Sequence, residues 1–251
     1  MKKRIFVGLL AALAFNFHGF AAGFNKTTAY ADGTFTDVPD SEWYASEVKS
    51  AYELGFMNGV GGSLFSPDGN VTVAEAVTMA ARVHASYNGT EISKDVPGEW
   101  YAPYVKYAVD NKMISENRFD EYDRPITRAE MAEVFYASVP QNYLKPVNAV
   151  DYLPDINENA DYREQVLALY KAGVVMGNDA YGSFYPNNPI IRCEAAAITN
   201  RIALPENRLQ KTLQKREDPT PAVYFIDDSG ALSATTYGAY GWEFDSRGVP
   251  A

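Results

Sequence analysis

"PITRAE", residues 125–130, is the stretch that decides how this chain folds. Thr127 followed by Glu130 forms a capping box, in which each side chain bonds an unpaired backbone amide at the start of an α-helix. Arg128 therefore falls at the first helical position, where a cation is unfavourable by about 0.3–1 kcal/mol. An arginine at the positive end of a helix needs a reason, and the rest of the sequence supplies one.

The helix start belongs to a pattern that occurs three times. Each copy has an aspartate, a helical stripe that begins at a tyrosine, a loop with a phenylalanine, and a second helix near a glutamate. The i, i+4, i+7 spacing of each stripe indicates an amphipathic helix that buries one face. The aspartates are Asp37, Asp95 and Asp155, the stripes are Tyr44-Val48-Ala51, Tyr101-Val105-Ala108 and Tyr162-Val166-Leu169, and the glutamates are Glu75, Glu130 and Glu194.

A single helix–loop–helix unit of this kind cannot bury its apolar face alone. We therefore expect a mainly α fold in which three helix–loop–helix repeats close around a pseudo-threefold axis, followed by a short β-rich tail. The expected division is a signal peptide at 1–31, repeats at 32–87, 90–140 and 148–204, a charged helix and linker at 205–222, and a Gly/Tyr-rich tail at 223–251.

The first 31 residues have the composition of a secretory leader. "MKKR" is basic, Ile5–Phe15 is apolar, and Ala29-Tyr30-Ala31 fits a small-residue cleavage site. The apolar run is too short to cross a bilayer. We therefore expect an exported protein with no membrane span.

Charge excludes several functions. Loss of residues 1–31 removes four basic and no acidic side chains, which takes the formal net charge from −10 to −14. Nucleic acid is not an expected partner, because no basic surface is available to displace counterions. Cys193 is the single cysteine and His84 the single histidine after residue 31, so a zinc site is not expected. We expect neither a metal nor a cofactor.

The pattern "F-x-D-V…W-Y…A…G…G…F-x-P…" ending in "ITRAE" resembles the S-layer homology (SLH) domain, and the resemblance covers about residues 33–203. It implies a three-lobed helical pseudo-trimer that anchors exported proteins to cell-wall polysaccharide, often one that bears pyruvyl ketals. The expected localisation is thus secreted and associated with the cell wall. Self-association through the tail is a further expectation.

Arg128 gains a role from this resemblance. A helix start with unpaired amides attracts anions, and a guanidinium adds a planar fork for carboxylate or phosphate. Arg192 in "IIRCE" repeats the feature, and Thr127 and Thr72 are the matching caps. On this hypothesis Arg128→Ala leaves stability unchanged or slightly raised. The alternative is a surface ion pair with Asp123, Glu121 or Glu133.

Aromatic and acidic side chains complete the candidate groove. Trp43 and Trp100 precede the core-facing tyrosines, where an indole can stack on a sugar or simply pack in the core. Asp37, Asp95 and Asp155 either cap turns or, as the resemblance implies, accept sugar hydroxyls at the groove rim.

The copies are unequal. Val73 replaces the arginine in copy one, the copy-two loop "MISENRFDEYDRP" has no glycine, and copy three has Asp161 where the tryptophan aligns. We expect one or two working grooves built from neighbouring copies.

The favoured function is a non-enzymatic anchor that binds an anionic secondary cell-wall polysaccharide. One alternative is a secreted carbohydrate-acting enzyme, which needs a positioned carboxylate pair. The other is a structural surface-layer component that assembles through its C-terminal tail.

Overall fold

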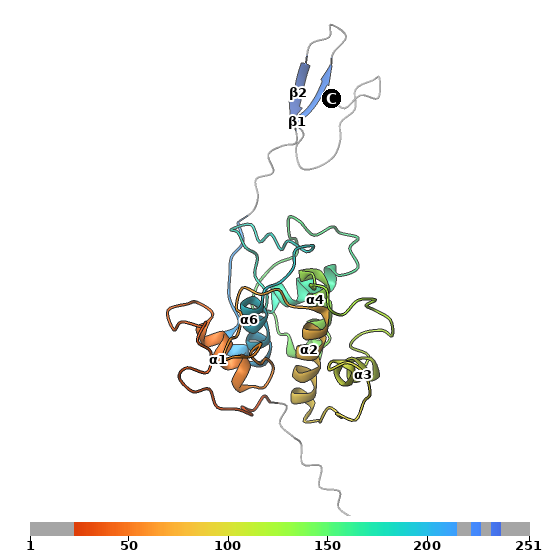
Figure 1. The fold of residues 1–251 in the computed structure, drawn as a ribbon. Helices are drawn as coiled ribbons and strands as arrows, with labels where there is room; N and C mark the ends of the chain where they lie inside the picture. The colour runs from red at the N-terminus through yellow and green to blue at the C-terminus, as the bar shows by residue number, and fades with distance from the viewer. Residues whose placement is uncertain (1–22, 215–221, 227–231, 237–251) are drawn as a thin grey trace, which may run out of the picture.

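The computed structural model describes residues 23–214 and the backbone of two later strands, and within this part the protein is mainly helical, as expected (Figure 1). The six α-helices are α1 Ala45–Glu53, α2 Val73–Asn88, α3 Ala102–Asp110, α4 Arg128–Tyr136, α5 Arg163–Lys171 and α6 Arg192–Ala203. Two single 3-10 turns, η1 Gln141–Tyr143 and η2 Pro205–Asn207, follow α4 and α6.

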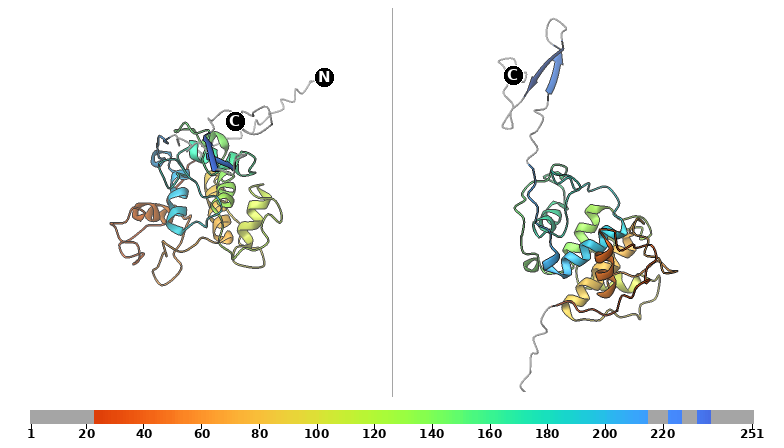
Figure 2. Two further views of the ribbon diagram at one scale, coloured as in Figure 1. Left: turned by 90° about the horizontal axis from the view of Figure 1, so that it is seen from above. Right: turned by 90° about the vertical axis from the view of Figure 1, so that its left-hand side faces the viewer.

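Each repeat supplies two helices, which we group as lobe 1 (α1, α2), lobe 2 (α3, α4) and lobe 3 (α5, α6). The first helix of each lobe packs against the second helix of the preceding lobe, so α3 lies on α2, α5 on α4, and α1 closes the ring on α6. In Figures 1 and 2, α1 and α3 lie on opposite flanks of α6 and α2. No lobe is a complete unit, because each apolar face is covered by a neighbour.

Three backbone hydrogen bonds join the lobes in a cycle at the starts of α2, α4 and α6. The amide of Ile126 donates to the carbonyl of Val71 (2.9 Å), Ile190 to Ile126 (3.3 Å) and Val71 to Ile190 (2.9 Å). All three side chains are fully buried. This cycle is the pseudo-threefold axis that the number of repeats predicts.

The predicted helical stripes face the core to different extents. Val48, Ala51, Val166 and Leu169 are fully buried, whereas Val105 of lobe 2 is half-buried. α2 and α6 meet across small side chains, since Ala76, Ala80, Ala195 and Ala196 are also fully buried. Small residues at a helix contact allow the helix axes to approach closely.

The sequence signals for helix ends are confirmed in lobes 1 and 3. Thr72 forms the predicted capping box with Glu75. Gly55 and Gly173 follow α1 and α5 with φ values of +74° and +71°, the left-handed conformation that glycine adopts without strain. A Cβ at Gly173 would lie 2.4 Å from the carbonyl oxygen of Leu209, so this glycine also permits a close backbone approach.

The prediction of a charged helix after α6 is wrong for the part that is described. Only η2 forms, and residues 208–214, which we call the C-terminal strap, run in extended form along lobe 3. The amide of Leu209 donates to the Gly173 carbonyl (3.0 Å) and that of Gln214 to the Ala180 carbonyl (2.9 Å). Backbone groups that bond lobe 3 in this way are unavailable for helical hydrogen bonds.

The tail contributes one antiparallel strand pair, β1 Ala222–Ile226 and β2 Leu232–Thr236, in which Ala222 faces Thr236 and Ile226 faces Leu232. This strand pair lies in the tail that was expected to be β-rich. The rest of the tail and leader residues 1–22 lie outside the described residues, and so does the expected self-association through the tail.

Candidate functional site: two grooves between the lobes

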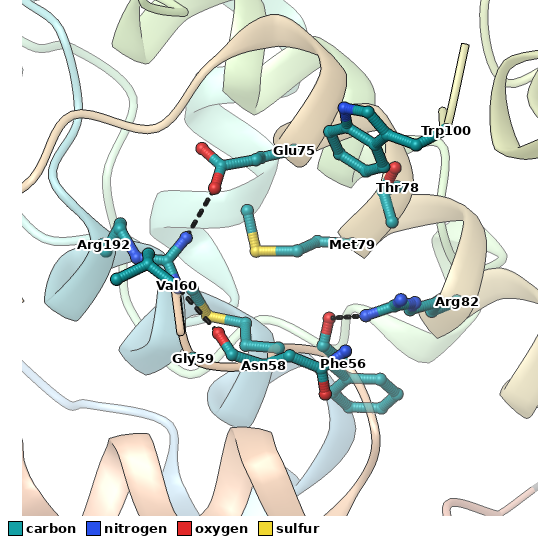
Figure 3. Close-up of a pocket in the computed structure, with 11 residues that line it drawn as sticks. Phe56, Asn58, Gly59, Val60, Glu75, Thr78, Met79, Arg82, Trp100 and Arg192 are labelled. Atoms are coloured by element: carbon teal, nitrogen blue, oxygen red, sulfur yellow. Dashed lines mark hydrogen bonds and ion pairs between the residues drawn. The ribbon is translucent and has the colours of Figure 1, made fainter. Parts of the chain in front are cut away.

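Two grooves of similar size lie between the lobes. Groove A has a volume of about 250 Å³, and its polar and aromatic lining includes Asn58, Glu75, Arg82, Trp100 and Arg192 (Figure 3). Groove B has a volume of about 230 Å³, and its lining includes Trp43, Arg128, Asn178, Glu194 and Arg201.

The two grooves are built by the same rule. In groove A the loop and second helix come from lobe 1, Trp100 comes from lobe 2 and Arg192 from lobe 3. In groove B the loop and second helix come from lobe 3, Trp43 comes from lobe 1 and Arg128 from lobe 2. Each groove therefore needs all three lobes, which is how ring closure brings distant residues together.

Arg192 acts as a clamp between lobes 3 and 1. Its Nε donates to the carbonyl of Phe65 (2.8 Å), and its Nη2 donates to the carbonyl of Asn58 (2.7 Å). Its Nη1 pairs with Glu75 at 2.6 Å. Burial lowers the pKa of Arg192, and the Glu75 carboxylate opposes that effect. Figure 3 shows the guanidinium held between Glu75 and Asn58.

Arg128 repeats the clamp between lobes 2 and 3 with one contact fewer. Its Nε donates to the Phe184 carbonyl (2.8 Å) and its Nη1 pairs with Glu194 at 3.0 Å. Among the described residues, no acceptor faces its Nη2. The predicted alternative partners Asp123, Glu121 and Glu133 are not the ones used. Arg128 and Arg192 are each only 5% exposed, so neither is a surface side chain.

The expectation of free amides at the helix starts is wrong. The amides of Arg128 and Ala129 donate to the carbonyls of Asn188 (2.9 Å) and Pro186 (3.0 Å) in lobe 3. Arg192 and Cys193 bond lobe 1 in the same way, through the carbonyls of Gly69 and Pro67. The Thr127 hydroxyl accepts a hydrogen bond from the amide of Glu130, as the predicted capping box at α4 requires. The cation at the helix start is explained by its contacts with the neighbouring lobe.

The junction between lobes 1 and 2 lacks an arginine clamp, because Val73 stands at the start of α2. Glu130, the counterpart of Glu75 and Glu194, pairs instead with Arg124 of its own lobe at 2.6 Å. Arg124 and the Thr127 cap hold the pKa of Glu130 below its usual value although burial opposes them. The Glu130 carboxylate is thus paired within its own lobe, unlike Glu75 and Glu194, which pair with an arginine of another lobe.

The two tryptophans lie in the grooves. Trp43 and Trp100 are 59% and 56% exposed, so the alternative of core packing is wrong. Each indole stands edge-on to the tyrosine that follows it, with ring centroids 5.5 Å apart in both lobes. More than half of each tryptophan is therefore exposed to solvent in its groove.

Asp37 and Asp155 hold backbone turns. Asp37 accepts the amides of Phe65 (2.8 Å) and Ser66 (2.7 Å), and Asp155 accepts those of Phe184 (2.9 Å) and Tyr185 (2.6 Å). These contacts match the turn-cap interpretation and fix the loops that Arg192 and Arg128 then bind. Asp95 is exposed, and its side chain makes no such bond within the described part of lobe 2.

Sequence reasoning missed Arg82 and Arg201, which line grooves A and B. Each lies seven residues after the groove glutamate, on the same face of its helix. Arg82 donates to the Phe56 carbonyl (3.1 Å) and Arg201 to the equivalent Val174 carbonyl (3.4 Å). Comparison of the aligned copies at this position would have found them, since lobe 2 has Ala137 instead.

The closed ring defines a class of helical repeat protein with grooves between its lobes. Residues 34–77, in lobe 1, and residues 153–196, in lobe 3, each match the S-layer homology domain family.

Curated relatives share the similarity over part of their length. The chain is 24% identical to an S-layer protein of Bacillus thuringiensis subsp. finitimus, over 77% of this chain and 23% of that protein. It is 28% identical to a cellulosome-anchoring protein of Acetivibrio thermocellus, over 58% of this chain and 35% of that protein. It is 27% identical to an amylopullulanase of Thermoanaerobacterium thermosulfurigenes, over 71% of this chain and 10% of that protein. The chain spans well under half the length of each.

The described residues contain neither a bilayer-spanning helix nor a cluster of metal-ligating side chains. In that part of the chain no helix has the length and hydropathy that a bilayer crossing requires. Nor do three or more His, Cys, Asp or Glu side chains gather there as metal ligands. Cys193 is buried, and burial raises its pKa to about 11.

Proposed function

We propose that this protein attaches to the cell envelope by binding an anionic wall polysaccharide in grooves A and B. The observation that carries the proposal is the charge of the grooves. Each groove brings two arginines and one glutamate together, in a chain whose net charge is −10. A local cationic site is what an acidic protein needs to hold an anionic polymer.

The side chains divide the work of recognition. A guanidinium offers a fork of donors to a carboxylate, such as that of a pyruvyl ketal. In groove B the Nη2 of Arg128 is available for this contact, and in groove A Arg82 is the more exposed of the two arginines. Trp43 and Trp100 offer an exposed aromatic face to the C–H face of a sugar ring.

Lobe 2 serves in this proposal as a third SLH repeat with a structural task. Residues 90–140 supply Trp100 to groove A and Arg128 to groove B. The place where a third groove would form lacks both the clamp arginine and the indole, since Val73 and Asp161 occupy those positions. Two grooves of three are therefore the expected number of binding sites.

Anchoring fits the relatives whose names describe surface-layer and cellulosome-anchoring proteins. The amylopullulanase shows that such segments also occur in enzymes. We expect this chain, incubated with wall polysaccharide or peptidoglycan, to release no new reducing ends. Turnover above that of a heat-killed control would favour the carbohydrate-acting alternative.

Cosedimentation with purified wall sacculi tests the proposal. The protein should pellet with protein-free sacculi and stay in solution after acid has removed the secondary polymer. Equal binding to both preparations would assign the affinity to peptidoglycan and contradict the proposal. Soluble polymer released by the acid and added back should compete for the grooves.

A further inference from the structure

Two segments of the chain perform the same task in lobes 1 and 3. Residues 24–30, which we call the N-terminal strap, cross the end of α1, and residues 144–150 cross the end of α5. The amides of Thr27 and Thr28 donate to the carbonyl of Glu53, the last residue of α1 (2.7 and 3.2 Å). The amides of Val147 and Asn148 donate to that of Lys171, the last residue of α5 (2.7 and 2.9 Å).

The apolar side chains of the two segments also correspond. Phe24 and Tyr30 of the N-terminal strap pack on the core at the same spacing as Leu144 and Val150, which are buried. Phe24 stands edge-on to Phe56, with centroids 5.7 Å apart. Residues 144–150 lie within the chain and so cannot be part of a leader. Their counterpart therefore belongs to the folded domain.

Further contacts fasten the N-terminal strap to α1. Lys26 pairs with Glu53 at 2.6 Å, and this contact, more than any other, lowers the pKa of the nearly buried Glu53 carboxylate. The turn at Gly55 is shaped around the strap, since a Cβ there would lie 2.6 Å from the Thr27 hydroxyl. Tyr30 stands edge-on to Phe35 and Tyr52, at centroid distances of 5.8 and 5.9 Å. Cleavage after Ala31 would remove all of these contacts.

We propose that the leader is removed before Phe24, by hydrolysis of the Ala21–Ala22 peptide bond. Water adds across that bond and leaves a carboxylate on Ala21 and an amine on Ala22. Gly19 and Ala21 supply the small side chains that a signal peptidase requires on either side of one free position. The inference goes beyond glycan binding and rests only on export through the leader.

The mature N-terminus is directly measurable. The full chain should be expressed in a bacterium that exports it, and the processed protein should be analysed by intact mass and N-terminal sequencing. We expect a chain that begins at Ala22. A chain that begins at Asp32, or one that keeps its leader after export, would overturn the proposal.

Two matched pairs of variants test both the cleavage site and the contribution of the N-terminal strap to stability. Ala21→Leu should block or displace cleavage, whereas Ala31→Leu should leave the mature mass shifted by the substitution alone. Phe24→Ala should lower the melting temperature of the exported protein by about 3–6 °C, and Asn25→Ala, at an exposed neighbour, should not. An exported Phe24→Ala protein with the wild-type mass and melting temperature would show that residue 24 had been removed with the leader. The mature protein would then lack the N-terminal strap, and the proposal would be wrong.

Discussion

Grooves A and B have the same construction but different surroundings. In groove A, Arg82 lies beside Tyr104, whose hydroxyl accepts hydrogen bonds from both Arg82 and Lys94. These cations draw the pKa of Tyr104 below its usual value although burial opposes them. In groove B, Arg201 lies near the carboxylate of Glu47, which accepts a hydrogen bond from Asn200. Arg82 and Arg201 occupy equivalent positions, but a lysine lies close to Arg82 and a glutamate lies close to Arg201.

The clamps differ as well. Arg192 has three acceptors in lobe 1, whereas Arg128 has two in lobe 3. Both arginines bond the carbonyl of the equivalent phenylalanine, and the side chains around them differ. Groove A is consequently more cationic, and groove B has the guanidinium with a free edge. The comparison teaches that one fold can carry two sites with unlike charge preferences.

The largest expected effect is on stability. Arg192→Ala removes a buried cation that bonds two carbonyls and one carboxylate, and should lower the free energy of unfolding by about 3–5 kcal/mol. Arg128→Ala should cost about 1 kcal/mol less, the value of one hydrogen bond. Urea unfolding measures both.

Lys106→Ala is the control for the clamps. It breaks an exposed ion pair with Asp110 and should change stability by less than about 1 kcal/mol. If both arginine variants unfolded like the wild type, the clamp interpretation would fail, and binding an anion would be the one role left for these two arginines.

The second effect is on binding. Trp100→Ala should lower the affinity of groove A for the polymer by about tenfold, and Trp43→Ala should lower that of groove B by as much. A tenfold loss corresponds to about 1.4 kcal/mol. Both side chains are exposed, so the melting temperature should hardly change. Isotherms on isolated sacculi measure the loss, and in the double variant both sites should bind about tenfold more weakly than in the wild type.

Tyr152→Ala is the matched control for the tryptophans, because Tyr152 is 62% exposed and lines neither groove. A similar loss of affinity in Tyr152→Ala would show that the sacculi bind exposed aromatics without selectivity.

A smaller effect on affinity should show how the charges near the two grooves differ. In a Trp100→Ala background, where groove B is measured alone, Glu47→Gln should raise affinity for the anionic polymer by about two- to threefold at low salt. The reason is that Arg201 loses a nearby negative charge, and the gain should vanish at high ionic strength, where such interactions are screened. Glu116→Gln, at an exposed position of lobe 2, should give no gain. An unchanged affinity for Glu47→Gln would mean that the two grooves are electrostatically alike.

The smallest effect concerns pH. His84 of α2 contacts the Tyr107 hydroxyl at 2.9 Å, while the equivalent position in α6 is Ala203. Burial lowers the pKa of His84, so below about pH 6.5 the unfolded chain binds more protons than the folded one. Stability should therefore fall as pH drops from about 6.5 through the lower pKa of the folded state.

The histidine contribution should be small, because the ring is partly exposed to solvent and its charge is therefore screened. His84→Gln should remove it from melts recorded between pH 7 and pH 5. Parallel pH profiles for the wild type and the variant would contradict the assignment.

Local sequence rules predicted the helices of this protein, because caps and stripes depend on residues a few positions apart. Thr127 with Glu130, and Val48 with Ala51, are examples that need no tertiary information. The partners of Arg128 and Arg192 were not predictable in that way. Phe184 and Glu194 lie far along the chain, and only ring closure brings them to Arg128.

The failed predictions have the same physical origin. The helix amides looked free because the carbonyls that bind them belong to another lobe. The segment after α6 looked helical because its charges suit a solvated helix, yet lobe 3 offers Gly173 and Ala180 as backbone partners. The resemblance to the SLH family agreed with the ring closure that the number of repeats predicts, but it placed the aspartates at the groove rim, whereas Asp37 and Asp155 cap turns.

The cycle of three hydrogen bonds at the pseudo-threefold axis also has a mechanical meaning. A pull on the chain beyond the C-terminal strap enters the molecule through lobe 3, whose inner residue Ile190 is joined to both other lobes. Lobe 3 cannot peel away by itself without opening the cycle and both grooves together. A polymer bound as proposed in groove A or B would touch all three lobes and would hold the cycle closed. Force and ligand would then act on the same contacts, and the protein should resist force best when a groove is occupied.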